Sequence, residues 1–191
     1  MSSPSVTIVD YQLGNLFSVR KACETLGCAA TVSSEPQDIA AADALILPGV
    51  GAFGQAMENL HRLDLVQPLL DHVAAGKPLF GICLGLQLLF EESEEFGNPK
   101  GLSILRGSVK KLPVSESPVP QIGWNRTEPG PTRTDGWTRS PLANVKAGSW
   151  MYFVHSFYVE NSDPQDGLCK TEYSGFHYTS AALKESVFAT Q

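Results

Sequence analysis

Short, continuous apolar runs constrain the fold of this chain most strongly. Residues 44–47 read Ala-Leu-Ile-Leu and residues 78–82 read Pro-Leu-Phe-Gly-Ile, so apolar side chains stand at consecutive positions. Such runs are typical of strands that are covered on both faces. Residues 5–10, which are rich in β-branched residues, predict another strand. A helix on each side of the sheet is therefore needed to cover these strands.

Strand and helix alternate through the first half of the chain. The strands are expected at residues 5–10, 29–32, 44–47 and 78–82, and the helices at residues 16–26, 52–60, 65–75 and 84–92. This alternation predicts an α/β fold with a mostly parallel sheet and helices on both faces.

The second half of the chain has a different pattern. Strands joined by turns are expected at residues 102–112, 120–127, 149–160, 167–173 and 179–191. Residues 128–139 are rich in Gly, Pro, Thr and Arg, which predicts a surface loop. We expect antiparallel strands here, and a single domain over residues 1–191, because the length suits one domain and no internal repeat interrupts it.

Composition and charge exclude several function classes. The residues are 42% hydrophobic and 18% charged, as in ordinary globular proteins, and the net charge of -6 argues against nucleic acid or an anionic membrane as a partner. No apolar stretch approaches the length of a membrane span, and no signal peptide is recognisable. The four cysteines show no metal-binding spacing. We therefore expect a cytoplasmic location, no metal and no cofactor.

Residues 81–85 form the pattern Gly-x-Cys-x-Gly between an expected strand and an expected helix. A cysteine on such a tight turn lies at the amino end of the helix, where free N–H groups and the helix dipole favour thiolate and lower the thiol pKa. Cys83 is therefore a candidate nucleophile, and the N–H of Leu84 is a candidate oxyanion donor. The other cysteines are interpreted as core residues: Cys23, Cys28 and Cys169.

The segment around Cys83 resembles the nucleophile motif of class I, triad-type glutamine amidotransferases. Within that class, further segments resemble the glutaminases of histidine biosynthesis; they are residues 10–16, 48–54, 121–125 and 152–158. The matches keep one order and span nearly the whole chain. The Pro-Gly-Pro-Gly usual in anthranilate-type chains and the Gly-Gly-Glu-Ser-Thr of the vitamin B6 type do not occur. The resemblance implies the flavodoxin-like class I glutamine amidotransferase fold.

The resemblance also implies an activity and a site. Glutamine is expected to be hydrolysed to glutamate and ammonia through a thioester on Cys83, with the oxyanion held by the backbone of Leu84 and of Val50 or Gly51. Implied substrate-binding residues are Gly49, Gly51, Gln87, Ser156 and Phe157. His155 is expected to be a structural group with a backbone partner rather than the base.

A partner enzyme is implied as well. It is a cyclase subunit with a (β/α)₈-barrel fold, which uses the ammonia to make imidazole glycerol phosphate and an aminoimidazole carboxamide ribonucleotide. Asn15 and Trp124 are candidate contacts with this subunit, in a heterodimer that channels ammonia. A helix cap for Asn15 and a core position for Trp124 remain open as alternatives.

Departures from the family pattern qualify the expected activity. Gln121 stands where the family usually has His, and Phe157 where Tyr is common. The Phe-His-Pro-Glu-Lys-Ser motif that supplies the triad His and Glu does not occur in the 191 residues, and His155 and His177 are the only nearby substitutes. We therefore expect an incomplete C-terminal end and an inactive chain. A catalytically dead partner-binding module, or the glutaminase subunit of another biosynthetic amidotransferase, remains an alternative.

Overall fold

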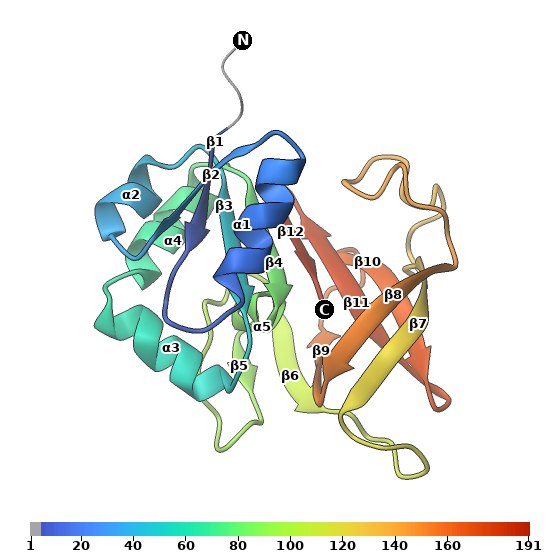
Figure 1. The fold of residues 1–191 in the computed structure, drawn as a ribbon. Coiled ribbons are helices and arrows are strands. Elements are labelled where there is room, and N and C mark those ends of the chain that lie inside the picture. Colours follow the sequence, from blue (N-terminus) through green and yellow to red (C-terminus); the bar gives the residue numbers. More distant parts are fainter. Residues whose placement is uncertain (1–4) are drawn as a thin grey trace.

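The computed structural model describes residues 5–191 and arranges its strands in the order β2-β1-β3-β4-β12-β11-β10-β7-β8 (Figure 1). The strands are β1 (Ser5–Val9), β2 (Ala29–Ser33), β3 (Leu45–Gly49), β4 (Leu79–Cys83), β5 (Glu92–Ser93), β6 (Gly107–Lys111), β7 (Gln121–Pro129), β8 (Ser149–His155), β9 (Phe157–Asn161), β10 (Gly167–Tyr173), β11 (Phe176–Lys184) and β12 (Val187–Thr190). The helices are α1 (Leu16–Thr25), α2 (Pro36–Ala41), α3 (Phe53–Arg62), α4 (Val66–Ala74) and α5 (Leu84–Leu88).

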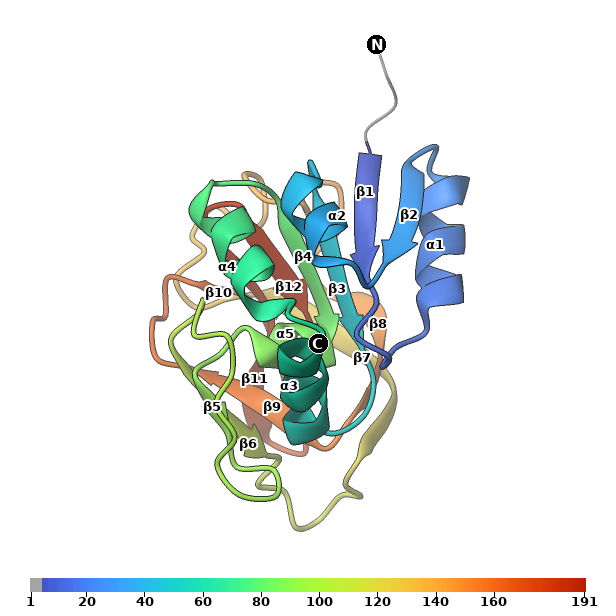
Figure 2. The same cartoon turned by 90° about the vertical axis from the view of Figure 1, so that its left-hand side faces the viewer.

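Five neighbouring strands, from β2 to β12, pair in parallel. Alternate residues of β3 show how this part is covered. Leu45 and Leu47 enter the cluster that contains residues of α3 and α4, while Ile46 packs with Cys23 of α1. Figure 2 shows α1 on one side of these strands and α3 and α4 on the other. The predicted parallel sheet with helices on both faces is therefore confirmed.

The second part of the sheet is antiparallel, as expected. β11 pairs with β12 and β10, β10 with β7, and β7 with β8. β9 pairs with both β6 and β11. Side chains of β8, β9 and β11 pack together in a second buried cluster. That cluster contains Leu112, Phe153, Tyr158 and Tyr178. The antiparallel part therefore has a small core of its own beside the main one.

Some expected elements have different bounds. The helix expected at residues 84–92 ends at Leu88, because loop N–H groups of Leu102 and Ile104 donate to the carbonyls of Leu88 and Leu89 and so end it. The strand expected at residues 102–112 begins only at Gly107.

Other elements were divided or missed. The strand expected at residues 149–160 is interrupted at Ser156, which separates β8 from β9. The short helix α2 was not predicted, since six residues carry too little periodic pattern. β12, grouped with the second half by sequence, pairs in parallel with β4 and so closes the parallel part.

Candidate active site

Cys83 occupies a strained turn between β4 and α5. Its φ of 55° and ψ of -110° are unfavourable for a residue with a side chain. A Cβ at Gly85 would lie 1.8 Å from the carbonyl oxygen of Leu47, and one at Gly81 would lie 3.0 Å from the Cβ of Ala189. A side chain is therefore excluded at Gly85, and one at Gly81 would require its neighbours to shift.

A glycine-rich segment runs beside this turn. Gly49 is the register partner of Cys83 in the β3–β4 pair. A Cβ at Gly49 would lie 2.1 Å from the hydroxyl oxygen of Tyr11, which donates to the carbonyl of Pro48 at 2.7 Å. Gly51 has a φ of +118°, which favours glycine. The backbone of residues 49–51 thus lies at the same sheet edge as Cys83.

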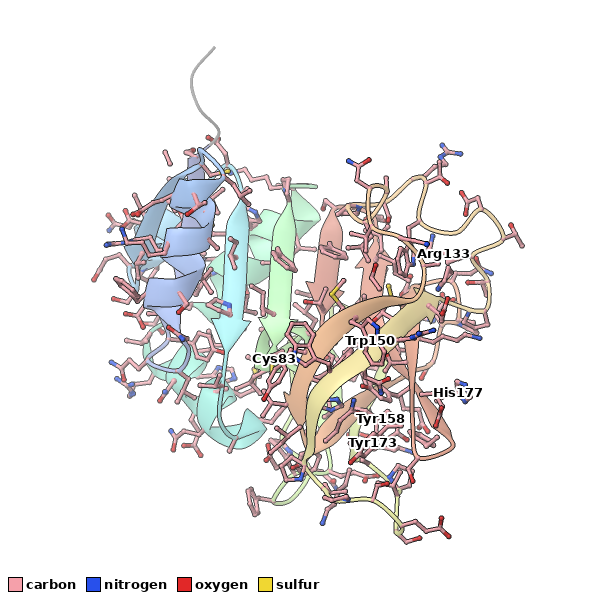
Figure 3. The ribbon with its side chains drawn as sticks, turned by 45° about the vertical axis from the view of Figure 1, so that its right-hand side comes forward. Cys83, Arg133, Trp150, Tyr158, Tyr173 and His177 are labelled. Carbon is pink, nitrogen blue, oxygen red and sulfur yellow. The ribbon has the colours of Figure 1, made fainter. Side chains whose placement is uncertain are left out.

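These segments enclose a cavity of about 290 Å³. It is lined by Val50, Gly51, Cys83, Leu84, Gln87, Glu95, Pro120, Val154, His155, Ser156 and Phe157. The structure therefore brings together all of the predicted catalytic and substrate-binding residues except Gly49, which lies directly beside Cys83 without lining the cavity. Figure 3 shows Cys83 at the end of its strand, between the parallel part and the β7–β8 hairpin.

Two glutamine side chains connect the cavity wall to the sulfur. Gln87 lies on the helical turn after Cys83, as expected, and its Nε2 donates to the carbonyl of Phe157 (3.3 Å) and to Oε1 of Gln191 (3.0 Å). Nε2 of Gln191 in turn donates to Sγ of Cys83 at 3.6 Å. Sequence reasoning did not single out Gln191, because its contact with Cys83 depends on the pairing of β12 with β4, which no local pattern indicates.

The electrostatics of the thiol differ from the expectation. Burial raises the pKa of Cys83 above its ordinary value, and the N–H of Leu84 and the carboxamide of Gln191 oppose this only in part. The N–H of Leu84 at the helix terminus does lower this pKa, as expected, but burial outweighs it and the net shift is upward. The physical reason is that the sulfur is largely withdrawn from water, which penalises its charged form.

His155 is held from both sides of its ring, and it has the backbone partner that was expected. Nδ1 donates to the carbonyl of Phe157 (2.8 Å), and Nε2 is hydrogen-bonded to the hydroxyl of Tyr178 (3.1 Å), which also contacts Oε1 of Gln121 (3.0 Å). Burial lowers the pKa of His155, so the neutral ring is favoured. His177, the other candidate base, is exposed on β11 and lies apart from Cys83 (Figure 3).

The two candidate contact residues have different surroundings. Asn15 caps α1, because its side chain accepts from the N–H of Ser18 at 3.2 Å, so the cap alternative holds. Trp124 is 68% exposed on β7, which rules out a core position. Its ring packs edge to face against that of Tyr152, with the ring centroids 5.6 Å apart.

Trp124 is part of a larger exposed surface on the β7–β8 hairpin. We call it the hairpin face; it consists of the cross-strand pairs Ile122 and Val154, Trp124 and Tyr152, and Arg126 and Trp150. The guanidinium carbon of Arg126 lies over the Trp150 ring, 5.1 Å from its centroid. Val154 also lines the cavity, so the hairpin face is continuous with the site.

The remaining cysteines agree with a core interpretation. Cys23 and Cys169 are buried, and Cys28 is partly buried against the same cluster as Cys23. Within residues 5–191, no group of His, Cys, Asp and Glu is arranged to hold a metal ion. Over the same residues, no helix combines the length and the apolar character that a membrane crossing requires.

Comparison with known proteins identifies the family. Residues 7–191 match the family described as glutamine amidotransferase class-I. The chain belongs to the class I glutamine amidotransferases. Among curated members, the imidazole glycerol phosphate synthase subunit HisH of Chlorobium chlorochromatii (strain CaD3) is 46% identical over 187 residues, covering 97% of this chain and 90% of that protein. The HisH subunit of Aquifex aeolicus (strain VF5) is 44% identical over 188 residues, covering 96% and 86%.

Solved structures agree with this glutamine amidotransferase fold. A crystal structure of a glutamine amidotransferase gives a TM-score of 0.72 at 16% identity, covering 96% of this chain and 87% of that one. The structure of PurLQS from Thermotoga maritima gives a TM-score of 0.69 at 17% identity, covering 99% and 86%. At these identities the likeness establishes the fold, and it confirms the predicted fold class.

Proposed function

We propose that this chain is the glutaminase subunit of an imidazole glycerol phosphate synthase. It hydrolyses glutamine to glutamate and ammonia and delivers the ammonia to a cyclase subunit in histidine biosynthesis. The observation that carries the proposal is the 46% identity to a HisH subunit across 97% of the chain. The cavity that contains Cys83 and Gln87 supports it, because a nucleophile and polar groups meet there in one partly closed site.

The reaction begins at the sulfur. The Cys83 thiolate attacks the carboxamide carbon of glutamine and forms a tetrahedral oxyanion, which the N–H of Leu84 and an N–H of Val50 or Gly51 stabilise. Collapse breaks the C–N bond, and a proton from a general acid lets ammonia leave. Water then attacks the γ-glutamyl thioester, which releases glutamate and restores the thiol. Loss of one oxyanion donor typically slows such a step about 100- to 1000-fold.

The groups that surround the thiol do not supply the general acid and base, so other residues must supply them. Both ring nitrogens of His155 are engaged, and His177 lies on another face. Neither of these two histidines is therefore free to act as a base on Cys83. The same observation favours a second candidate function, a module that binds the partner without turnover.

The hairpin face is the proposed docking surface for the cyclase, a (β/α)₈ barrel. Its exposed aromatic side chains and Arg126 belong to the residue types that are enriched in protein interfaces, and it adjoins the cavity through Val154. Ammonia is mostly protonated and non-nucleophilic in neutral water, so a closed route between the two sites is required. The heterodimer combines hydrolase and lyase chemistry and makes imidazole glycerol phosphate and an aminoimidazole carboxamide ribonucleotide. We place it in the cytoplasm, without nucleic acid or membrane partners.

Glutamate release in the presence of the cyclase tests this function. The 191-residue chain is assayed by itself and after extension with the Phe-His-Pro-Glu-Lys-Ser motif and following residues of a HisH relative. We expect the extended chain to release glutamate at least 100-fold faster, and Cys83→Ser to abolish this release while Cys28→Ser does not. Cyclase binding without glutamate release by the extended chain would favour the partner-binding module. Release that is unaffected by Cys83→Ser would refute the proposed chemistry.

A further inference from the structure

We propose that Gln191 is a positioning residue for the nucleophile, because a directed chain of amide hydrogen bonds holds its N–H group on the sulfur of Cys83. The inference rests on the proposed function only in taking Cys83 as the reacting thiol. It assigns a role to a residue that the sequence patterns left without one. The whole chain of bonds lies inside the cavity wall, between Phe157 and the turn after β4.

The direction of the chain is fixed at its far end. The carbonyl oxygen of Phe157 can only accept, so the NH₂ end of the Gln87 carboxamide must face it (3.3 Å). The same NH₂ group donates to Gln191, so the oxygen end of the Gln191 carboxamide must face Gln87 (3.0 Å). Only the NH₂ end of Gln191 is then left for Cys83, at 3.6 Å from Sγ. Reversing both amides would set the oxygen of Gln87 against the carbonyl oxygen of Phe157 and lose the hydrogen bond that anchors the chain.

The anchor of the chain is itself rigid. The carbonyl of Phe157 also accepts from Nδ1 of His155 at 2.8 Å, and Nε2 of that ring is hydrogen-bonded to Tyr178. His155, Gln87 and Tyr178 are all buried. Gln191 is held by its backbone as well, because its N–H donates to the carbonyl of Ser180 at 2.9 Å. The donor that faces the sulfur is therefore positioned before any substrate arrives.

The consequence is a bias towards the charged form of the sulfur. A donor aimed at the sulfur stabilises thiolate more than thiol, since only the thiolate is a strong acceptor. The surrounding titratable groups offer no such help. The Tyr11 hydroxyl donates to the carbonyl of Pro48, and the Glu95 side chain accepts from the N–H of Phe53. Both ring nitrogens of His155 already have hydrogen-bond partners. The carboxamide of Gln191 thus partly offsets the cost of burying the thiolate.

The test measures the pH dependence of alkylation of Cys83 by iodoacetamide in the 191-residue chain, followed by peptide mass spectrometry. Gln191→Met keeps the length of the side chain but removes the donor. We expect it to raise the midpoint of alkylation by about one pH unit, as the loss of a hydrogen bond to a charged group predicts. Gln191→Glu should raise it further, because a carboxylate then faces the thiolate. Thr190→Val alters the neighbouring residue, on the opposite face of the strand, and should leave the midpoint unchanged.

A second variant tests whether the orientation of the Gln191 amide, rather than the packing of its side chain, determines the effect. Gln87→Leu removes the group that orients Gln191, although the bonds of Gln87 itself do not reach the sulfur. We expect it to raise the midpoint in the parent chain and to have no further effect beside Gln191→Met. Equal midpoints for Gln191→Met and the parent would overturn the proposal, as would equal effects of Gln87→Leu in both backgrounds. These results are independent of glutamate release, so a failure here is distinguishable from a failure of the proposed function.

Discussion

The turn that carries Cys83 and the hairpin face lie side by side but are built in opposite ways. At the turn, close backbone packing determines which residues fit. The carbonyl oxygen of Leu47 lies 1.8 Å from where a Cβ of Gly85 would be, and the backbone of Cys83 is strained. On the hairpin face, regular antiparallel strands present large aromatic side chains to solvent, and Trp124 is 68% exposed. The comparison teaches that the chemistry depends on close packing, whereas partner binding depends on side chains that the fold itself does not need.

The largest effect is expected at the turn. Gly85→Ala forces a Cβ into the carbonyl of Leu47 and should destabilise the fold by about 3 kcal/mol, the upper end of what overpacking usually costs. Chemical denaturation measures this. Gly54→Ala is the matched control, because its Cβ would meet only Pro99 at 3.8 Å within a helix, where Ala is favoured. Equal stability of the two variants would contradict the packing argument.

The next effect concerns the hairpin face alone. Trp124→Ala should weaken binding to the cyclase by about 2 kcal/mol, as expected for an aromatic hot spot, and leave the unfolding free energy nearly unchanged. Calorimetric titration with the cyclase measures the affinity. Leu26→Ala is the control, since Leu26 is 80% exposed at the far end of α1. If both variants bind equally well, the docking surface lies elsewhere.

The smallest effect distinguishes the two candidate contact residues. Asn15→Ala removes the cap of α1 and should lower the unfolding free energy by about 1 kcal/mol. If capping is its main role, Asn15→Ser, which keeps a capping oxygen, restores stability and cyclase affinity together. Affinity that stays low in Asn15→Ser while stability returns would show that Asn15 contacts the partner directly.

The sequence predicts what local spacing determines. Gly-x-Cys-x-Gly after an apolar run is sufficient to place Cys83, Leu84 and Gln87 on one turn, and the structure has them there. What it could not predict depends on distant residues. The contact between Gln191 and Cys83 joins positions 108 residues apart, and it requires β12 to pair with β4.

The sign of the thiol pKa shift was missed for a related reason. Spacing shows that a helix follows Cys83, but burial depends on the whole cavity wall, including residues near Glu95 and Ser156. The exposure of Trp124 agrees with its expected place at a contact surface, and it excludes the core position that the sequence had left open.

The most direct test of the central claim is covalent labelling of the protein with a chloroketone analogue of glutamine, in which the thiolate displaces chloride. Peptide mass spectrometry locates the adduct, with and without excess glutamine. The account predicts a single adduct on Cys83 that glutamine suppresses. An adduct confined to Cys28, Cys23 or Cys169, or labelling of Cys83 that glutamine does not affect, would contradict it.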